Sequence, residues 1–280
     1  MPQVELSAGV IEYEDTGGAG PVLVLLHGLL MDGSVWRQVV SELRAGHRCV
    51  MPTLPLGAHK HPMREDADLS MRGIARLVGE LLERLDLKDV TLALNDWGGA
   101  LLLFSEGPVE RVKRLVVASC EAFDNVPPGL PGRMAVLAAR TPGGLTVAMQ
   151  QLRFRFMRRS SMAFGLMSKR PIPHEVMDSW FQPVLTQPQV RRDLKKYLRG
   201  AKEAKRDLIA ATEQLRAFDR PALVAWAAED RIMPPEHGRR LAEVLPRAQL
   251  IEIEDSYTLI PEDQPGQLAD AIRRFVRDTR

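Results

Sequence analysis

Cysteine and histidine are scarce in this 280-residue sequence, which contains two of the first and six of the second. Because Cys49 and Cys120 lie far apart, we expect neither a CxxC metal pair nor a secreted disulfide framework. No histidine follows His237, so the last part of the chain supplies no imidazole. The run His59-Lys60-His61 is too little for a metal site, and the sequence predicts no metal and no cofactor.

The sequence also lacks segments that would direct it to a membrane or to nucleic acid. No uncharged apolar run approaches the ~18 residues that a membrane-spanning helix needs. The segment Met1–Glu5 shows no basic stretch followed by an apolar one, so we expect no signal peptide and a soluble cytoplasmic protein. The net charge of +2 gives no general attraction to membranes or nucleic acid, and no zinc pattern or helix-turn-helix is visible.

Apolar residues, 45% of the chain, follow a pattern of strands alternating with helices. This alternation predicts a mostly parallel sheet with helices on both faces. Ser70 is predicted to cap a helix over Met71–Leu85, and Ser34 one over Val35–Leu43. Eight strands are predicted, at Val4–Leu6, Val10–Glu14, Val22–Leu26, Arg48–Met51, Val90–Leu94, Leu115–Ala118, Ala222–Ala227 and Gln249–Ile253.

From residue 127 to residue 215 the pattern is helical only. We expect this insertion to form a cap over the carboxyl ends of the strands, where open α/β sheets bind ligands, and residues 1–126 and 216–280 to form the core. Gln151–Arg206 holds fourteen Lys or Arg and four Asp or Glu. Either these charges form a solvated helix surface, or the cap attracts an anionic substrate or an acidic partner.

The segment Val90–Gly99 combines a buried strand, a tight turn and the start of a helix. A nucleophile elbow has this layout, with small residues such as Gly98 and Gly99 after the nucleophile so that the helix packs closely. Asp96 would then project above the sheet edge near a helix N-terminus, which favours negative charge. The alternative is that Asp96 only caps this helix.

The order of these features resembles the α/β-hydrolase superfamily over essentially the whole chain. A strand ends at His27-Gly28, the Asp96–Gly99 elbow follows, then the helical insertion, and Asp230 comes after a late strand. Asp followed by Trp-Gly is similar to the haloalkane dehalogenase and epoxide hydrolase branch. Leu94, where other branches have glycine, also favours that branch. The resemblance implies an eight-stranded α/β-hydrolase fold and a carboxylate nucleophile.

In that branch the carboxylate, here Asp96, attacks a saturated carbon, and the first step needs no base. The resemblance implies an oxyanion hole formed by the backbone N–H groups of Leu29 and Trp97. It also implies that the indole N–H of Trp97 holds a leaving halide. Trp36 or Trp180 could provide the second donor if the cap brings them in; otherwise they pack in the core. Epoxide hydrolases use two cap tyrosines, and the insertion has only Tyr197.

The positions that would complete a catalytic triad are unusual. Asp230 matches the position of the family's acid, and Glu121 matches an alternative acid position. Counting back five residues from Glu262 places Tyr257 at the histidine position, and a tyrosine is protonated at neutral pH and is a poor base. Asp230 or Glu121 could act as base through a water molecule. A replacement imidazole could come from three other histidines, namely His59, His61 and His174.

Three functions are therefore compatible with the sequence. The first is a hydrolase that uses Asp96 on a carbon–halogen, epoxide or ester bond of a small molecule, with an atypical triad. The second is an elimination, decarboxylation, ring closure or isomerisation on the same scaffold, with Tyr257 as a proton donor. The third is an inactive member that binds a ligand or an acidic partner through its cap.

Overall fold

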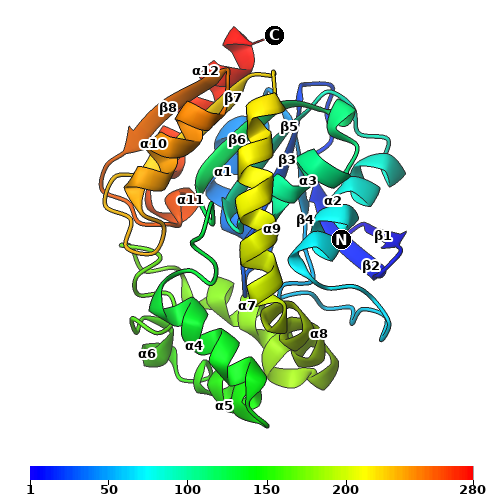
Figure 1. The fold of residues 1–280 in the computed structure, drawn as a ribbon, viewed down its shortest axis with the longest axis vertical. Coiled ribbons are helices and arrows are strands. Elements are labelled where there is room, and N and C mark those ends of the chain that lie inside the picture. The colour runs from blue at the N-terminus through cyan, green and yellow to red at the C-terminus, as the bar shows by residue number, and fades with distance from the viewer. Residues whose placement is uncertain (280) are drawn as a thin grey trace.

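An eight-stranded sheet forms the centre of the computed structural model, which describes residues 1–279 (Figure 1). The strand order is β1-β2-β4-β3-β5-β6-β7-β8. The pairs β1/β2 and β2/β4 are antiparallel and the other pairs are parallel, which confirms the predicted fold class. The strands are β1 (Gln3–Leu6), β2 (Gly9–Asp15), β3 (Val22–Leu26), β4 (Arg48–Pro52), β5 (Val90–Asp96), β6 (Val112–Cys120), β7 (Ala222–Ala227) and β8 (Ala248–Ile253).

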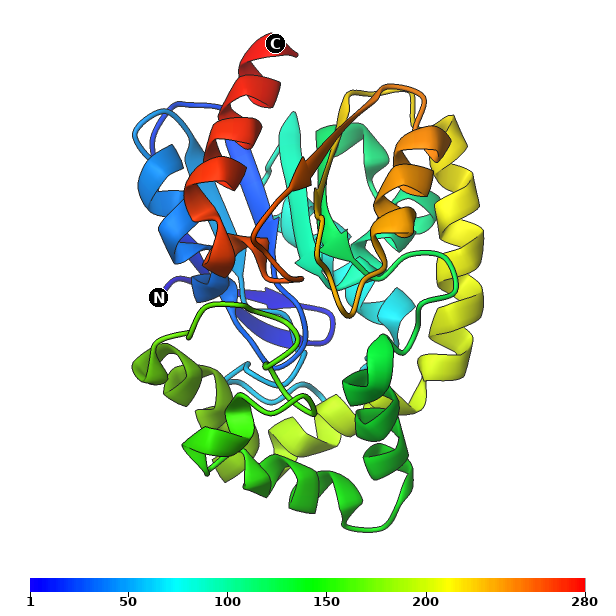
Figure 2. The ribbon, with the colours of Figure 1, turned by 90° about the vertical axis from the view of Figure 1, so that its left-hand side faces the viewer.

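Helices cover both faces of the sheet. Helices α1 and α12 pack against each other on one face, and α2, α3, α9 and α10 lie on the other (Figure 2). The core helices are α1 (Arg37–Leu43), α2 (Met71–Arg84), α3 (Leu103–Glu106), α10 (Pro235–Val244), α11 (Ile260–Asp263) and α12 (Pro265–Asp278), with short 3₁₀ turns η1 (Gly33–Trp36), η2 (Gly98–Leu102), η3 (Val109–Arg111) and η4 (Leu215–Ala217).

The apolar runs predicted as central strands are buried as expected. Every residue of β5 and β7 is buried, because helices cover both sides of these strands. Ser70 caps α2, its hydroxyl accepting a hydrogen bond from the Gly73 N–H at 3.0 Å. The predicted Ser34 cap is wrong. The side chain of Asp32 accepts from the Ser34 N–H at 2.9 Å and caps the 3₁₀ turn η1. Helix α1 follows this turn directly and begins at Arg37.

The segment between β6 and β7 folds into six helices. Helices α4 to α8 gather beyond the carboxyl ends of the parallel strands, and α9 runs back along the core against η2 (Figure 1). The division at residues 126/127 and 215/216 stays a prediction. No helix within residues 1–279 is long and apolar enough to cross a membrane. The cap helices are α4 (Gly129–Arg140), α5 (Gly144–Gln151), α6 (Arg155–Arg158), α7 (His174–Thr186), α8 (Pro188–Arg199) and α9 (Ala201–Gln214).

Candidate active site

Strand β5 delivers Asp96 to a sharp turn at the carboxyl edge of the sheet. The backbone φ of Asp96 is +67°, in the left-handed region that non-glycine residues rarely adopt. The Asp96 carbonyl accepts from the Glu121 N–H at 3.0 Å, which ties the turn to the end of β6. A strained residue held by its neighbours at a strand end is typical of a functional site.

The loop after β3 passes directly over the Asp96 carboxylate. The Leu29 N–H donates to Asp96 Oδ2 at 3.1 Å. A Cβ on Gly28 would lie 1.8 Å from that same oxygen, so only glycine allows this approach. Glycine is therefore required at residue 28 for the Leu29 N–H to reach the Asp96 carboxylate.

His27 supports this loop from inside the core and does not line the cavity described below. Its Nε2 accepts from the Leu54 N–H at 2.8 Å, which leaves Nδ1 to donate to the Gly28 carbonyl at 2.8 Å. Complete burial lowers the His27 pKa to about 4, so the ring is neutral. His27, which the sequence places beside the predicted oxyanion-hole loop as a candidate substrate-binding residue, therefore holds the backbone through both ring nitrogens and does not reach the cavity.

Two buried carboxyl groups lie close together at the elbow. Burial raises the pKa of Asp96 to about 7, against the effect of the Leu29 N–H and with a further rise from Asp230. Burial, followed by the negative charge of Asp96, raises the pKa of Glu121 to about 8. The Gly98 N–H donates to Glu121 Oε2 at 3.3 Å and partly offsets this rise. At neutral pH the pair therefore carries fewer than two charges.

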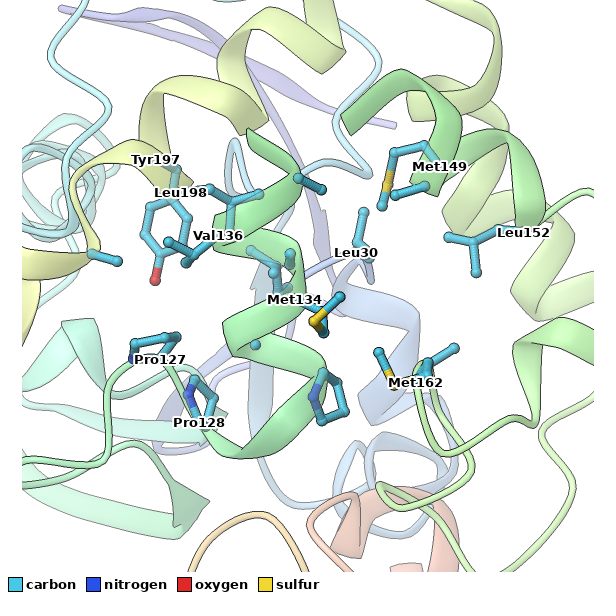
Figure 3. Close-up of a pocket in the computed structure, with 18 of the residues that line it drawn as sticks. Leu30, Pro127, Pro128, Met134, Val136, Met149, Leu152, Met162, Tyr197 and Leu198 are labelled. Carbon is cyan, nitrogen blue, oxygen red and sulfur yellow. The ribbon is translucent and has the colours of Figure 1, made fainter. Parts of the chain in front are cut away.

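A cavity of about 580 Å³ opens between the elbow and the cap. Asp96 and Glu121 are the charged residues among those described in its lining, which is otherwise mostly apolar. Figure 3 shows Met134, Met149 and Met162 around it, with Tyr197 and Leu198 at another side. No described lysine or arginine lines the cavity, so the basic charges of the cap give no contact to an anionic substrate there. Such a lining suits a neutral, largely apolar molecule.

Trp97 lines the cavity with a buried indole N–H that forms no hydrogen bond of good geometry with a described residue, although it lies near enough to the Tyr197 hydroxyl to lower the pKa of that group. A buried donor without a partner is costly unless a ligand satisfies it. The backbone N–H of Trp97 donates instead to the Asn95 carbonyl at 2.8 Å. The prediction that this backbone group completes an oxyanion hole is therefore not met in this conformation, and the indole N–H is the available donor.

The other two candidate tryptophans do not line the cavity. The Trp36 indole N–H donates to the Leu26 carbonyl at 3.1 Å inside the core. The Trp180 indole N–H donates to Ser34 Oγ at 2.8 Å and to Asp32 Oδ1 at 3.1 Å. Both side chains are fully buried. Neither one is therefore available as a second halide donor, and both pack in the core, which is the alternative that the sequence left open.

Thr258, and not Tyr257, is the residue that contacts Asp230. The Thr258 hydroxyl donates to Asp230 Oδ1 at 2.7 Å, and that oxygen also accepts from the N–H groups of Ile232 and Met233. Asp230 Oδ2 is buried with no hydrogen bond of good geometry, and the Ser119 hydroxyl lies near the carboxyl group and lowers its pKa. Burial raises the Asp230 pKa. The position facing Asp230 therefore holds a short hydroxyl side chain, one residue after the position predicted from Glu262.

Tyr257 points away from the elbow. Its ring lies under the guanidinium of Arg231, 4.7 Å from the ring centroid, and near the Lys169 ammonium at 5.5 Å. Its backbone N–H donates to Asp263 Oδ2 at 2.9 Å. Tyr257 does not line the cavity, so the predicted role as a triad member or proton donor is not supported.

None of the six histidines, all within the described chain, lines the cavity. His59 is buried against Asp193, with Nε2 3.4 Å from Oδ2, and His61 contacts Glu12. His174 is exposed at the start of α7, and the His237 ring packs on Phe123. No replacement imidazole reaches the elbow. Within residues 1–279, no group of three or more His, Cys, Asp or Glu is placed to hold a metal ion.

Residues 23–271 match the model of the α/β hydrolase family. The chain belongs to this family. A Xanthomonas campestris pv. campestris relative, cis-3-alkyl-4-alkyloxetan-2-one decarboxylase, is 28% identical over 95% of this chain and 92% of its own length. Haloalkane dehalogenase 2 of Mycobacterium bovis is 24% identical over 95% of this chain and 91% of its own. The structure of haloalkane dehalogenase DbeA from Bradyrhizobium elkani matches with TM-score 0.79 and 18% identity, covering 99% of this chain and 96% of that one.

These matches confirm the resemblance stated from the elbow and the order of motifs. This protein is an enzyme of the α/β-hydrolase superfamily and shares its hydrolase-type architecture with the dehalogenases. The signal that located its site was the combination of Asp96-Trp97-Gly98 with His27-Gly28. Thr258 carried no such signal, since a threonine in a loop has no characteristic spacing.

Replacing Asp96 with Asn tests the cost of its burial. The Asp96 pKa of about 7 in the folded protein lies above the usual aspartate value of 3.8, so the wild type loses stability as pH rises from 4 to 7. Asp96→Asn removes this loss. The stability gain of the variant is expected to grow by about 2 to 3 kcal/mol between pH 5 and pH 8. Urea unfolding of both proteins at each pH measures it.

The matched control is Asp66→Asn, at an exposed loop position. Its effect on the free energy of unfolding is expected to stay within about 0.5 kcal/mol at both pH values. A gain in Asp96→Asn that is the same at pH 5 and pH 8 would contradict the raised pKa.

Proposed function

We propose that this enzyme uses Asp96 as a nucleophile to open a carbon–halogen, epoxide or ester bond in a small apolar molecule. The observation that supports this is the placement of the carboxylate. It stands at a strained turn on the floor of an apolar cavity, with one oxygen held by the Leu29 N–H and the unpartnered Trp97 indole in the same lining. A ligand with a polar leaving group would satisfy that indole N–H.

The first step is a displacement. Asp96 Oδ1, the oxygen not bonded to Leu29, attacks the substrate carbon as the bond to the leaving group breaks, and an aspartyl ester forms. The Trp97 N–H donates to the departing halide or oxygen. Burial and then Glu121 raise the pKa of Tyr197 well above its usual range, so its hydroxyl stays protonated and can donate to an opening epoxide. This step requires the ionised form of Asp96.

We propose Glu121 as the base that completes the reaction in place of histidine. It lines the same cavity, whereas Asp230 lies outside the lining and has one oxygen occupied by three donors. Esterification makes Asp96 neutral and so removes one of the causes that raise the Glu121 pKa. Glu121 then ionises more readily when a base is needed, and it can take a proton from a water that attacks the ester.

A second candidate is the decarboxylating opening of a four-membered lactone. Two observations favour it: no imidazole lines the cavity, and relatives named cis-3-alkyl-4-alkyloxetan-2-one decarboxylase match most of the chain. Asp96 would attack the saturated ring carbon bonded to the ring oxygen, and the bond between these two atoms would break to leave a carboxylate on the other ring carbon. Loss of CO₂ would then form a C=C bond and expel Asp96. This cycle needs neither water nor a base.

For the first candidate function, Glu121→Gln separates the formation of the aspartyl ester from its hydrolysis. With 1-bromohexane and 1,2-epoxyhexane, this variant is expected to form the alkyl ester and to hydrolyse it about a hundredfold more slowly, because a general base contributes about 10² or more. Intact-mass spectrometry measures the accumulating adduct, and halide or diol release measures turnover. Asp96→Asn should show no adduct.

The control is Glu65→Gln, at an exposed position far from the cavity lining. Absence of both turnover in the wild type and an adduct in Glu121→Gln across this panel, or an adduct that persists in Asp96→Asn, would contradict the nucleophile. For the second candidate, a cis-dialkyl β-lactone should yield an alkene and CO₂ with no ¹⁸O incorporated from labelled water. An ¹⁸O-labelled hydroxy acid would instead support hydrolysis.

Thr258→His is expected to restore an imidazole beside Asp230. Because Thr258 is the residue that bonds the acid, hydrolysis of the preformed ester should accelerate by about 10². The decay of the adduct mass in a single turnover measures this rate. Tyr257→His is the matched control and should leave the rate unchanged. Acceleration by Tyr257→His alone would show that Thr258 does not occupy the histidine position.

A further inference from the structure

The cap contains a long stretch without acidic residues. From residue 125 to residue 174 there are seven arginines, one lysine and no Asp or Glu. This stretch forms α4, α5, α6 and the loops around them, at the end of the molecule opposite the C-terminus (Figure 2). Charges that cancel over the whole chain are therefore separated in space, and the net charge of +2 hides a basic surface.

Half of these basic side chains have acidic partners and half do not. Arg155 and Arg158 pair with Asp178, and Lys169 and Arg170 pair with Asp255. The other four are exposed and have no ion pair with any described residue. They are Arg133, Arg140, Arg153 and Arg159.

Large apolar side chains are exposed on the same stretch. Phe156 is 74% exposed and Phe154 is 59% exposed, with ring centroids 6.0 Å apart. Single exposed apolar residues are common on soluble proteins, but a group of them marks an interaction surface. Seven large apolar residues are exposed within residues 125–174, whereas the rest of the described chain has three. These seven are Leu130, Met134, Leu137, Val147, Phe154, Phe156 and Met162.

This surface, which we call the cap patch, consists of those seven apolar residues and the four unpaired arginines. It includes the rim of the cavity, because Met134, Val147 and Met162 are exposed and also line the cavity. Figure 3 shows Met134 and Met162 beside that space. Exposed apolar side chains therefore lie at the rim of the cavity, on the same stretch of the cap that carries the four unpaired arginines.

We propose that the cap patch docks on an anionic lipid surface. Phe154 and Phe156 insert among the acyl chains, and the four arginines bind lipid phosphates. Exposed aromatic residues next to basic ones are typical of proteins that lie in a membrane interface. The cavity rim then faces the bilayer, where a neutral apolar molecule is concentrated. The inference does not depend on which reaction Asp96 performs.

The charge of the patch argues against a second copy of this chain as its occupant. Symmetric contact between two cap patches would bring unpaired arginines against unpaired arginines, which is repulsive. An anionic bilayer offers the opposite charge together with an apolar interior. The expectation from net charge that membranes play no part considered only the sum of charges, whereas attraction to a surface depends on their distribution.

Vesicle binding by the whole protein tests this proposal. The wild type is expected to co-sediment with vesicles of phosphatidylglycerol and phosphatidylcholine, and weakly with phosphatidylcholine alone. Arg153→Gln with Arg159→Gln should lower the partition coefficient about twenty-five-fold, since each basic residue contributes about fivefold. Phe154→Ser with Phe156→Ser should lower it about tenfold or more. About 0.5 M salt should weaken the binding of the wild type.

The control variant carries Arg44→Gln and Arg247→Gln. Both residues are exposed and precede β4 and β8, at the edge of the sheet opposite the cap. Its partition coefficient should stay within about twofold of the wild type. No binding to anionic vesicles, or equal losses in the control and the cap variants, would overturn the proposal. So would a concentration-dependent dimer that the phenylalanine variant abolishes, which would assign the patch to a second copy.

Discussion

The close contact between the loop after β3 and the Asp96 carboxylate determines how the site is built. The Leu29 N–H can reach Asp96 Oδ2 only because Gly28 has no side chain, and the loop holds its position because His27 is bonded on both ring nitrogens. A neutral His27 is suited to this task, since a charged ring could not accept from the Leu54 N–H. A buried histidine with a pKa lowered to about 4 thus serves the backbone and not the chemistry.

Burying a carboxylate in an apolar cavity has an electrostatic consequence that extends to Glu121. Glu121 resists ionisation first because it is buried and then because Asp96 is near, whereas Asp96 resists ionisation because it is buried, with a smaller contribution from Asp230. The two groups therefore titrate as a coupled pair, in which the charge of Asp96 raises the pKa of Glu121. Chemistry that removes the charge of Asp96 changes Glu121 at the same moment, and this coupling needs no conformational change.

Much of the fold could be predicted from the sequence because buried strands and helices have characteristic patterns of apolar residues. The apolar run Val90–Leu94 indicates a central strand, and Ser70 precedes an amphipathic helix that it caps. No such pattern predicts the direction in which a single side chain points. Trp36 and Trp180 are buried by the core and by η1, and Tyr257 packs under Arg231, although all three were chosen for their chemistry.

The histidine position shows why a site needs geometry as well as counting. A shift of one residue in a loop moves the expected role from Thr258 to Tyr257, whose side chains point in different directions. Thr258, Ile232 and Met233 bond one oxygen of Asp230, and the other oxygen is buried near the Ser119 hydroxyl. The carboxylate at the family's acid position therefore has a hydroxyl side chain beside it and no imidazole. Under the proposed mechanism this arrangement would affect the hydrolysis of the ester and not its formation, because displacement by a carboxylate needs no base.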